Sequence, residues 1–119
     1  MNIESLREFC LSLPVVSEDI KWDDDLCFSV GGKMFCVAWM GMPMKVSFKV
    51  REDEFEELSQ SDGFIPAPYM ARVKWVQLIK VELLDDKTFR DYIMQSYKLV
   101  IAKLTKKMRK ELGLDTVTE

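Results

Sequence analysis

The chain has 119 residues, 48% of them hydrophobic and 31% charged, and its formal net charge is −3. This length is close to the commonest size of a single domain, and the hydrophobic content suffices for one packed core, so we expect one domain over residues 1–119. The negative charge argues against a protein that coats nucleic acid, because Lys and Arg contacts to phosphate supply most non-specific affinity. The charge is uneven, at −6 over residues 1–60 and +3 over residues 61–119.

Three cysteines, Cys10, Cys27 and Cys36, lie inside apolar runs at wide spacing. Such an odd set is typical of buried small side chains in a reducing compartment rather than of a disulfide framework. No basic segment followed by an apolar one marks a secretion signal at the N-terminus, and no apolar run approaches membrane-spanning length. We therefore expect a cytoplasmic protein without a membrane segment, and a monomer.

The N-terminal third predicts one helix followed by a hairpin. Apolar residues at helical spacing after Asn2, a good capping residue, predict a helix over residues 3–12. Apolar and small polar residues then alternate over residues 26–30, and Gly31-Gly32 can supply the positive φ angles of a tight hairpin turn. Residues 34–40 are apolar throughout and predict a central strand with both faces covered.

The next strand has the clearest alternation in the chain, with one apolar and one basic face, because strand side chains point to opposite sides in turn. The apolar face carries Met44, Val46, Phe48 and Val50, and the other face carries Lys45, Ser47, Lys49 and Arg51.

The C-terminal half predicts a short acidic helix, a loop, a strand and a long helix. The order is a helix beginning at residue 52, a loop over residues 61–68, a strand over residues 74–81, a long helix capped by Asp85 or Asp86, and a short helix capped by Thr105.

The composition removes most catalytic designs. The chain contains no histidine, which excludes Ser-His and Cys-His pairs and histidine zinc sites, and no glycine-rich phosphate loop follows a strand. An acidic stretch covers residues 18–25, and its Asp23, Asp24 and Asp25 could bind a hard cation. Adjacent residues point in different directions, however, so a solvated acidic loop fits better. We expect no catalytic residue, no metal site and no cofactor.

Two groups of residues combine positive charge with a recognition surface. They are the strand face with Lys45, Lys49 and Arg51, and the segment with Tyr69, Arg72, Lys74 and Trp75. The first could bind anions, although a solvated outer face fits this pattern better. The second could stack bases or dock a peptide, although Tyr69 and Trp75 could instead belong to the core. Basic residues over 103–110 also match the dipole of a helix C-terminus.

Five local strings, in order, resemble the MmcQ/YjbR family of small bacterial proteins. They are CLSLP (10–14), VGGKMF (30–35), VSFKV (46–50), PYMAR (68–72) followed by KWV (74–76), and SYKLV (96–100) followed by KL (103–104). The likeness extends from about residue 3 to residue 112. It implies an α+β fold of the CyaY-like, frataxin type, in which an antiparallel sheet carries the N- and C-terminal helices on one face.

The resemblance also implies DNA binding, by a proposed likeness to a double-wing DNA-binding domain. The positions that match the family's motif are Lys49, Tyr69, Arg72, Lys74, Trp75, Ser96 and Tyr97. Where the family more often has a histidine or an Asn-Lys pair before the Trp, this chain has Arg72-Val73-Lys74, which keeps the charge but removes any histidine role. The frataxin likeness raises iron binding, but the first helix offers only Glu4 and Glu8 for it.

The sequence therefore predicts a non-enzymatic binding protein. The first hypothesis is DNA binding through the basic sheet face and the aromatic-basic loop, with phosphate contacts and base stacking. The alternative is an adaptor for an unidentified protein or small ligand, docked on residues 63–70 and the exposed part of the sheet. The salt dependence of binding distinguishes the two hypotheses. Salt weakens phosphate contacts but leaves apolar contacts to a partner unchanged, because apolar contacts are not screened.

Overall fold

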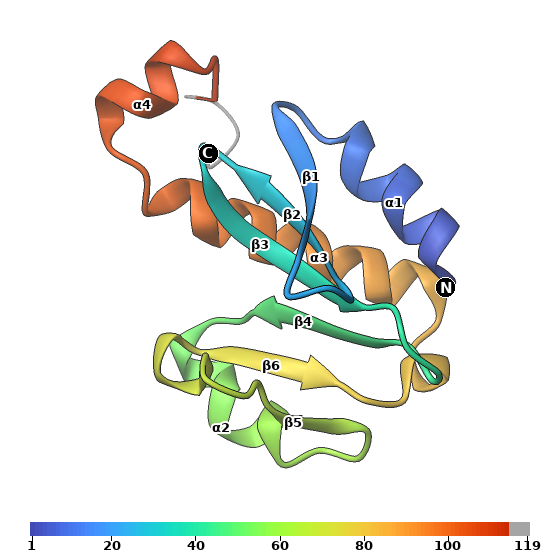
Figure 1. Cartoon of the computed structure of the whole chain (residues 1–119). Coiled ribbons are helices and arrows are strands. Elements are labelled where there is room, and N and C mark those ends of the chain that lie inside the picture. The colour runs from blue at the N-terminus through green and yellow to red at the C-terminus, as the bar shows by residue number, and fades with distance from the viewer. Residues whose placement is uncertain (115–119) are drawn as a thin grey trace.

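Six antiparallel strands form one sheet in the order β1-β2-β3-β4-β6-β5, as the computed structural model of residues 1–114 shows (Figure 1). The strands are β1 (Val16–Lys21), β2 (Asp25–Val30), β3 (Lys33–Trp39), β4 (Lys45–Lys49), β5 (Phe64–Pro66) and β6 (Trp75–Leu78). Gly31 and Gly32, with φ angles of 59° and 79°, make the predicted turn between β2 and β3.

The longer helices pack on one face of this sheet, so the predicted α+β fold is confirmed. The helices are α1 (Ile3–Ser12), α2 (Glu52–Ser59), α3 (Asp86–Ala102) and α4 (Lys106–Glu111), with single 3₁₀ turns η1 (Ala71–Val73) and η2 (Val81–Leu83). In Figure 1, α3 lies behind the sheet and α1 lies beside β1. Within residues 1–114 no helix is long and apolar enough to cross a membrane.

The helices begin where the sequence predicts. The Asn2 side chain accepts a hydrogen bond from the backbone N–H of Ser5 at 2.8 Å, and Asp85 accepts one from Thr88 at 2.7 Å. Thr105 caps α4 in the same way. Each of these bonds satisfies an N–H group that has no partner inside its helix, which contributes about 1 kcal/mol.

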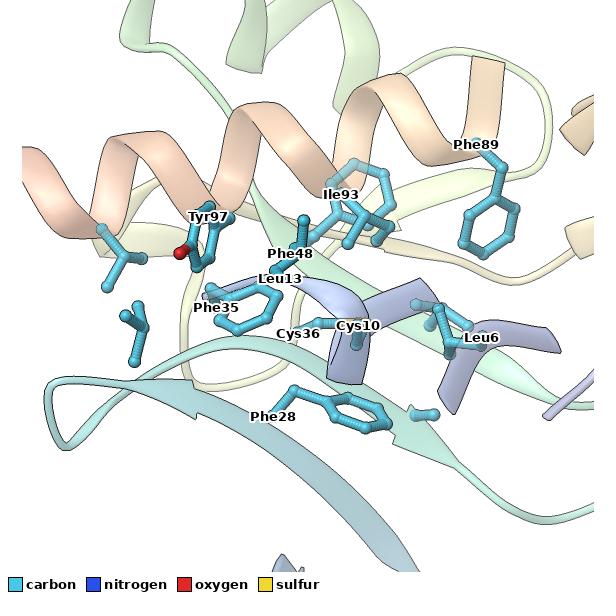
Figure 2. Packing of buried hydrophobic residues seen from close by; sticks show 14 of the residues in the cluster. Leu6, Cys10, Leu13, Phe28, Phe35, Cys36, Phe48, Phe89, Ile93 and Tyr97 are labelled. Carbon is cyan, nitrogen blue, oxygen red and sulfur yellow. The ribbon is translucent and has the colours of Figure 1, made fainter. Parts of the chain in front are cut away.

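The core fills the space between the sheet and the two longer helices. Phe35 and Phe48 of the strands point toward α3, which carries Tyr97, and Phe28 lies nearer to Cys10 and Leu6 of α1 (Figure 2). The rings of Phe35 and Tyr97 meet edge to face with centroids 5.3 Å apart. Each such buried side chain contributes about 1.5–3 kcal/mol, so the sheet face that meets the helices carries most of the stability.

The three cysteines are free and buried, which fits the small apolar role predicted for them. Cys10 of α1 and Cys36 of β3 belong to the same core (Figure 2). Burial raises the pKa of the Cys36 thiol well above its ordinary value, and the neighbouring Cys10 thiol raises it further. Because the thiolate is the reactive form, Cys36 is an inert packing residue at neutral pH.

Four strand predictions need correction. The acidic stretch and the loop over 61–68 contain edge strands, β1 and β5, because backbone pairing with β2 and β6 prevails over their polar and proline-containing sequences. Residues 34–40 do form a central strand, but its second face is not covered, and Val37 and Trp39 there are only half-buried. Arg51 does not extend the basic strand face, since β4 ends at Lys49.

Candidate ligand pocket

The sheet face away from the helices is here called the open face. The register of the strands decides which side chains are neighbours on it. Lys21, Asp25, Trp39 and Lys45 are consecutive partners across β1, β2, β3 and β4. Partners in register point to the same side of a sheet. Trp39 therefore lies between a carboxylate on one neighbouring strand and an ammonium group on the other.

A pocket of about 750 Å³ lies over this row of residues and over the neighbouring row of Val37, Ser47 and Gln77. Its floor consists of strand residues: Asp25, Met34, Val37, Trp39, Lys45, Ser47 and Gln77. Two connections form its walls, the turn that carries Trp22 and the segment over residues 67–70. Most of this lining is apolar or aromatic, so the pocket offers a planar or apolar molecule a large contact surface.

Both wall segments hold an aromatic residue in an unusual backbone conformation. Trp22 has a φ angle of 51° and Tyr69 one of 65°, in the left-handed region that costs a residue with a side chain about 1–3 kcal/mol. Trp22 is 67% exposed and Tyr69 is fully exposed, so Tyr69 gains no burial in return and Trp22 gains only part of it. The fold thus holds two aromatic rings in solvent at the pocket mouth.

The polar groups of the floor are few and specific. The Lys45 Nζ lies 5.1 Å from the centroid of the Trp39 ring, a cation–π contact. Desolvation raises the pKa of the half-buried Asp25, and the nearby Asp24 raises it further. No ion pair formed within residues 1–114 includes Asp25 or Lys45. The floor therefore holds two opposite charges, neither of which forms an ion pair inside this part of the chain.

Three of the predicted phosphate-binding cations have partners inside the protein. Lys49 donates a hydrogen bond to the Val73 carbonyl, and its pKa is lowered by burial first and by Lys103 second. Arg51 lies at the start of α2 and pairs with Asp53 at 3.3 Å and with Glu54 at 3.7 Å. The third cation, Lys74, has its Nζ 5.0 Å from the centroid of the Phe55 ring. Lys45, Lys49 and Arg51 thus do not form a continuous free strip.

The aromatic-basic loop divides into exposed and buried residues. Tyr69 and Arg72 are exposed, while Trp75 is only 3% exposed, on β6. Trp75 lies opposite Lys49 in register and outside the main core, so it covers the open face beside the pocket. Its ring is therefore a packing residue and cannot stack on a base without a rearrangement.

Ser96 and Tyr97 of α3 lie on the helix side of the sheet and bond to the backbone. The Ser96 hydroxyl donates to the Phe35 carbonyl at 2.6 Å and accepts from the Lys49 N–H at 2.9 Å. The Tyr97 hydroxyl donates to the Pro14 carbonyl at 2.6 Å. These two motif residues hold the structure together and lie away from the pocket.

Most of the pocket was not predicted as a site. The sequence prediction placed the segment 63–70 at a binding surface, but it did not include Trp22, Asp25 or Trp39. The available signal was the alternation of β2 and β3, which puts Asp25 and Trp39 opposite the core face. In residues 1–114 no group of three His, Cys, Asp or Glu side chains could hold a metal ion.

Known proteins resemble this chain in sequence and in fold. The YjbR family model matches residues 11–99, and no curated protein matches the chain. A Deinococcus radiodurans crystal structure with a DUF419 domain is 30% identical, has a TM-score of 0.86, and aligns over 95% of this chain and 88% of its own. A Pseudomonas syringae protein shares the fold at 18% identity with a TM-score of 0.69, over 83% of this chain and 98% of its own. The chain belongs to the YjbR family.

Proposed function

We propose that this protein is a non-enzymatic binding protein that takes up a small organic ligand in the open-face pocket. The observation that carries the proposal is the pair Trp22 and Tyr69, two exposed aromatic residues held in strained backbone conformations at the pocket mouth. Strain of this kind persists where the surrounding structure enforces it, and it concentrates at ligand-binding sites.

The dimensions and the lining of the pocket agree with this role. Small-molecule sites occupy about 300–1,000 Å³ and combine apolar walls with a few polar groups, and this pocket has about 750 Å³. Trp39, Val37 and Met34 supply apolar floor, while Ser47 and Gln77 offer hydrogen-bonding groups, joined to each other at 3.4 Å. A ligand ring would replace water on Trp22 and Tyr69, which stabilises the complex by about 25 cal/mol per Å² of apolar surface buried.

A fragment screen tests the proposal. Ligand-observed NMR with a library of planar and apolar fragments should find several weak binders of the natural protein. Tyr69→Ala should reduce their binding at least about fivefold, since a fully exposed side chain can be removed without unfolding the protein. Ile20→Ala is the matched control, because Ile20 is exposed but does not line the pocket. The proposal would be contradicted if Tyr69→Ala left the affinity of the fragments unchanged, or if Ile20→Ala reduced it by as much.

Nucleic acid is the second candidate, favoured by the exposure of Tyr69 beside Arg72. Base stacking on one exposed ring with one adjacent cation would give weak affinity with a shallow salt dependence. Fluorescence anisotropy with labelled single- and double-stranded DNA at low salt measures it. Binding lost with Arg72→Gln and with rising salt would support DNA, and no signal at tens of micromolar protein would remove it.

We also propose that the protein acts as a monomer in the cytoplasm. Three free, buried cysteines suit a reducing compartment. The pocket is formed by one chain, so ligand uptake requires no second copy.

A further inference from the structure

We propose that the turn between β3 and β4 binds a soft monovalent metal ion, Cu(I), through the thioether sulfur atoms of Met40, Met42 and Met44. The inference is separate from the proposed function, because none of these three residues lines the pocket. It follows from three features of the turn: the position of the methionines, their exposure, and the charge beside them. The sequence-based expectation of no metal site considered histidine, thiolate and carboxylate ligands, and it did not consider thioethers.

The strand register brings the methionines together. Trp39 and Lys45 are the last register pair of β3 and β4 before the turn. Continued by one residue in each strand, the register puts Met40 opposite Met44, on the same side of the hairpin. Side chains that lie directly opposite have Cβ atoms about 4.5–5.5 Å apart, and Met42 follows at the tip of the turn. Because methionine rotates about three side-chain bonds, the three sulfur atoms can reach one ion.

The exposure of two of these methionines has no packing explanation. Met42 is 94% exposed and Met40 is 39% exposed, and only Met44 packs against the core. Methionine usually fills gaps in a core, so the first two do not have its ordinary role. Within residues 1–114 the three sulfur atoms accept no hydrogen bond, whereas the sulfur of Met1 accepts one from Ser5 at 3.0 Å. Their lone pairs are therefore available to a ligand.

The ligand atoms decide the class of the ion. Thioether sulfur is soft and uncharged, and among metal ions it selects Cu(I), whereas Mg²⁺, Ca²⁺ and Mn²⁺ prefer oxygen. Three neutral ligands do not compensate the charge of the ion, which favours a monovalent ion over a divalent one. A reducing compartment, which suits the three free cysteines, also keeps copper as Cu(I).

The charge beside the turn favours a cation. The backbone N–H of Met40 donates to the Asp24 carbonyl at 3.0 Å, so the acidic turn before β2 adjoins the methionines. That turn carries Asp23 and Asp24, and Asp25 follows at the start of β2. Three carboxylates thus lie near the site against the single ammonium group of Lys45, and their field attracts positive ions.

The Trp39 ring can report on the ion. A Cβ atom on Gly41, between Met40 and Met42, would lie 2.0 Å from the Cη2 atom of Trp39, so the indole lies against the middle of the turn. Indole rings attract cations, as the Lys45 Nζ at 5.1 Å from this ring centroid illustrates. An ion held by the methionines should therefore change the Trp fluorescence, and Trp39→Phe should remove that change.

NMR of the full chain with isotope-labelled methionine methyl groups tests the inference. Ag(I) serves as an air-stable substitute for Cu(I). Titration with Ag(I) should shift the methyl signals of Met40, Met42 and Met44 until one ion is bound per chain, and should leave those of Met94 and Met108 in place. Zn²⁺ should shift none of them.

Variants measure the affinity for Cu(I) itself, by competition with the chelator bicinchoninate under ascorbate and without oxygen. Loss of even a residue behind the metal ligands typically weakens binding about 10–100-fold, so Met42→Leu should weaken it at least about tenfold. Met108→Leu is the matched control, because Met108 is an exposed methionine on α4, and it should keep the affinity. Leucine replaces methionine with little change in volume, so both variants should fold.

The outcomes are distinct from those of the fragment screen. If Ag(I) binds but leaves the three methyl signals in place, the cysteine thiols hold the ion and the inference is overturned. Equal losses with Met42→Leu and Met108→Leu, or equal shifts with Zn²⁺, overturn it as well. None of these results affects the pocket, because fragment binding is measured without metal. Shifts confined to the three methionines, with an affinity lost in Met42→Leu alone, establish the site.

Discussion

The Ser96 hydroxyl of α3 donates a hydrogen bond to the Phe35 carbonyl of β3 across 2.6 Å. The same oxygen accepts the backbone N–H of Lys49 at the end of β4. The last register pair between these strands is Cys36 with Phe48, so both backbone groups lie just beyond the regular ladder. A side chain of the helix thus completes the strand pairing where the backbone stops doing so.

Replacement of this hydroxyl should be destabilising. Ser96→Ala leaves a carbonyl and an N–H without their partner next to the core, and such unsatisfied buried groups cost about 1–3 kcal/mol. We expect the free energy of unfolding in urea to fall by that amount. Ser61→Ala is the control, since Ser61 is exposed and its hydroxyl bonds only to its preceding helix turn. Equal losses in both variants would show that the bridge is not important for stability.

The other motif residue should have a smaller effect. Tyr97→Phe keeps the ring that packs against Phe35 and removes only the hydroxyl bonded to Pro14. One hydrogen bond contributes about 1 kcal/mol net. Thermal unfolding should therefore begin a few degrees lower, whereas Tyr69→Phe, which changes a fully exposed ring, should leave it unchanged. A loss from Tyr97→Phe as large as that from Ser96→Ala would contradict this ranking.

The elements with strong local signals could be predicted from the sequence. The caps at Asn2 and Asp85 combine a side-chain acceptor with an apolar repeat, and the Gly31-Gly32 turn needs φ angles that glycine adopts freely. The weak strands could not be predicted. β1 is mostly polar, and β5 is three residues long and ends at Pro66, so only pairing with their neighbours makes them strands.

The pocket could not be predicted because it depends on tertiary arrangement. Alternation places Trp39 opposite the core face, but only the packed helices decide which face stays open. Likewise, no local rule favours a left-handed Trp22 or Tyr69, since that region is rare for residues with large side chains. The predicted strip of cations failed for two reasons. Lys49 bonds to the Val73 carbonyl, which only the fold brings near, and Arg51 pairs locally with Asp53 and Glu54 at the start of α2.

Trp22 and Tyr69 should lower the stability of the protein while they contribute to ligand binding. Asn tolerates the left-handed conformation much better than Trp or Tyr. Trp22→Asn and Tyr69→Asn should therefore raise the free energy of unfolding by about 0.5–1 kcal/mol, the usual gain from relieving such strain at an exposed site. Both should also weaken fragment binding. Leu11→Asn, at an exposed helical position, is the control and should not stabilise. Destabilisation by either turn variant would show that its ring packs more than its exposure indicates.

Asp25 should make stability depend on pH in an unusual direction. Desolvation raises its pKa, so the folded state holds the proton more tightly than the unfolded state does. The free energy of unfolding then falls as pH rises from the unfolded pKa of about 3.9 through the higher folded pKa. Asp25→Asn should be more stable than the natural protein at pH 7, with a difference that disappears below the unfolded pKa. Urea unfolding across this range measures it. A stabilisation of Asp25→Asn that persists in acid would contradict the explanation.

Gly41 should control the position of Trp39. A Cβ atom at residue 41 would lie 2.0 Å from the Cη2 atom of the Trp39 ring, far inside contact distance. Gly41→Ala should therefore displace the indole, shift the Trp fluorescence spectrum and cost about 1–3 kcal/mol. A double-mutant cycle isolates the cause: in a Trp39→Ala background the same substitution should cost less than about 0.5 kcal/mol. If the cost is the same in both backgrounds, the glycine serves the backbone of the turn. If it disappears, the missing side chain of Gly41 is what leaves room for the Trp39 ring on the pocket floor between Asp25 and Lys45.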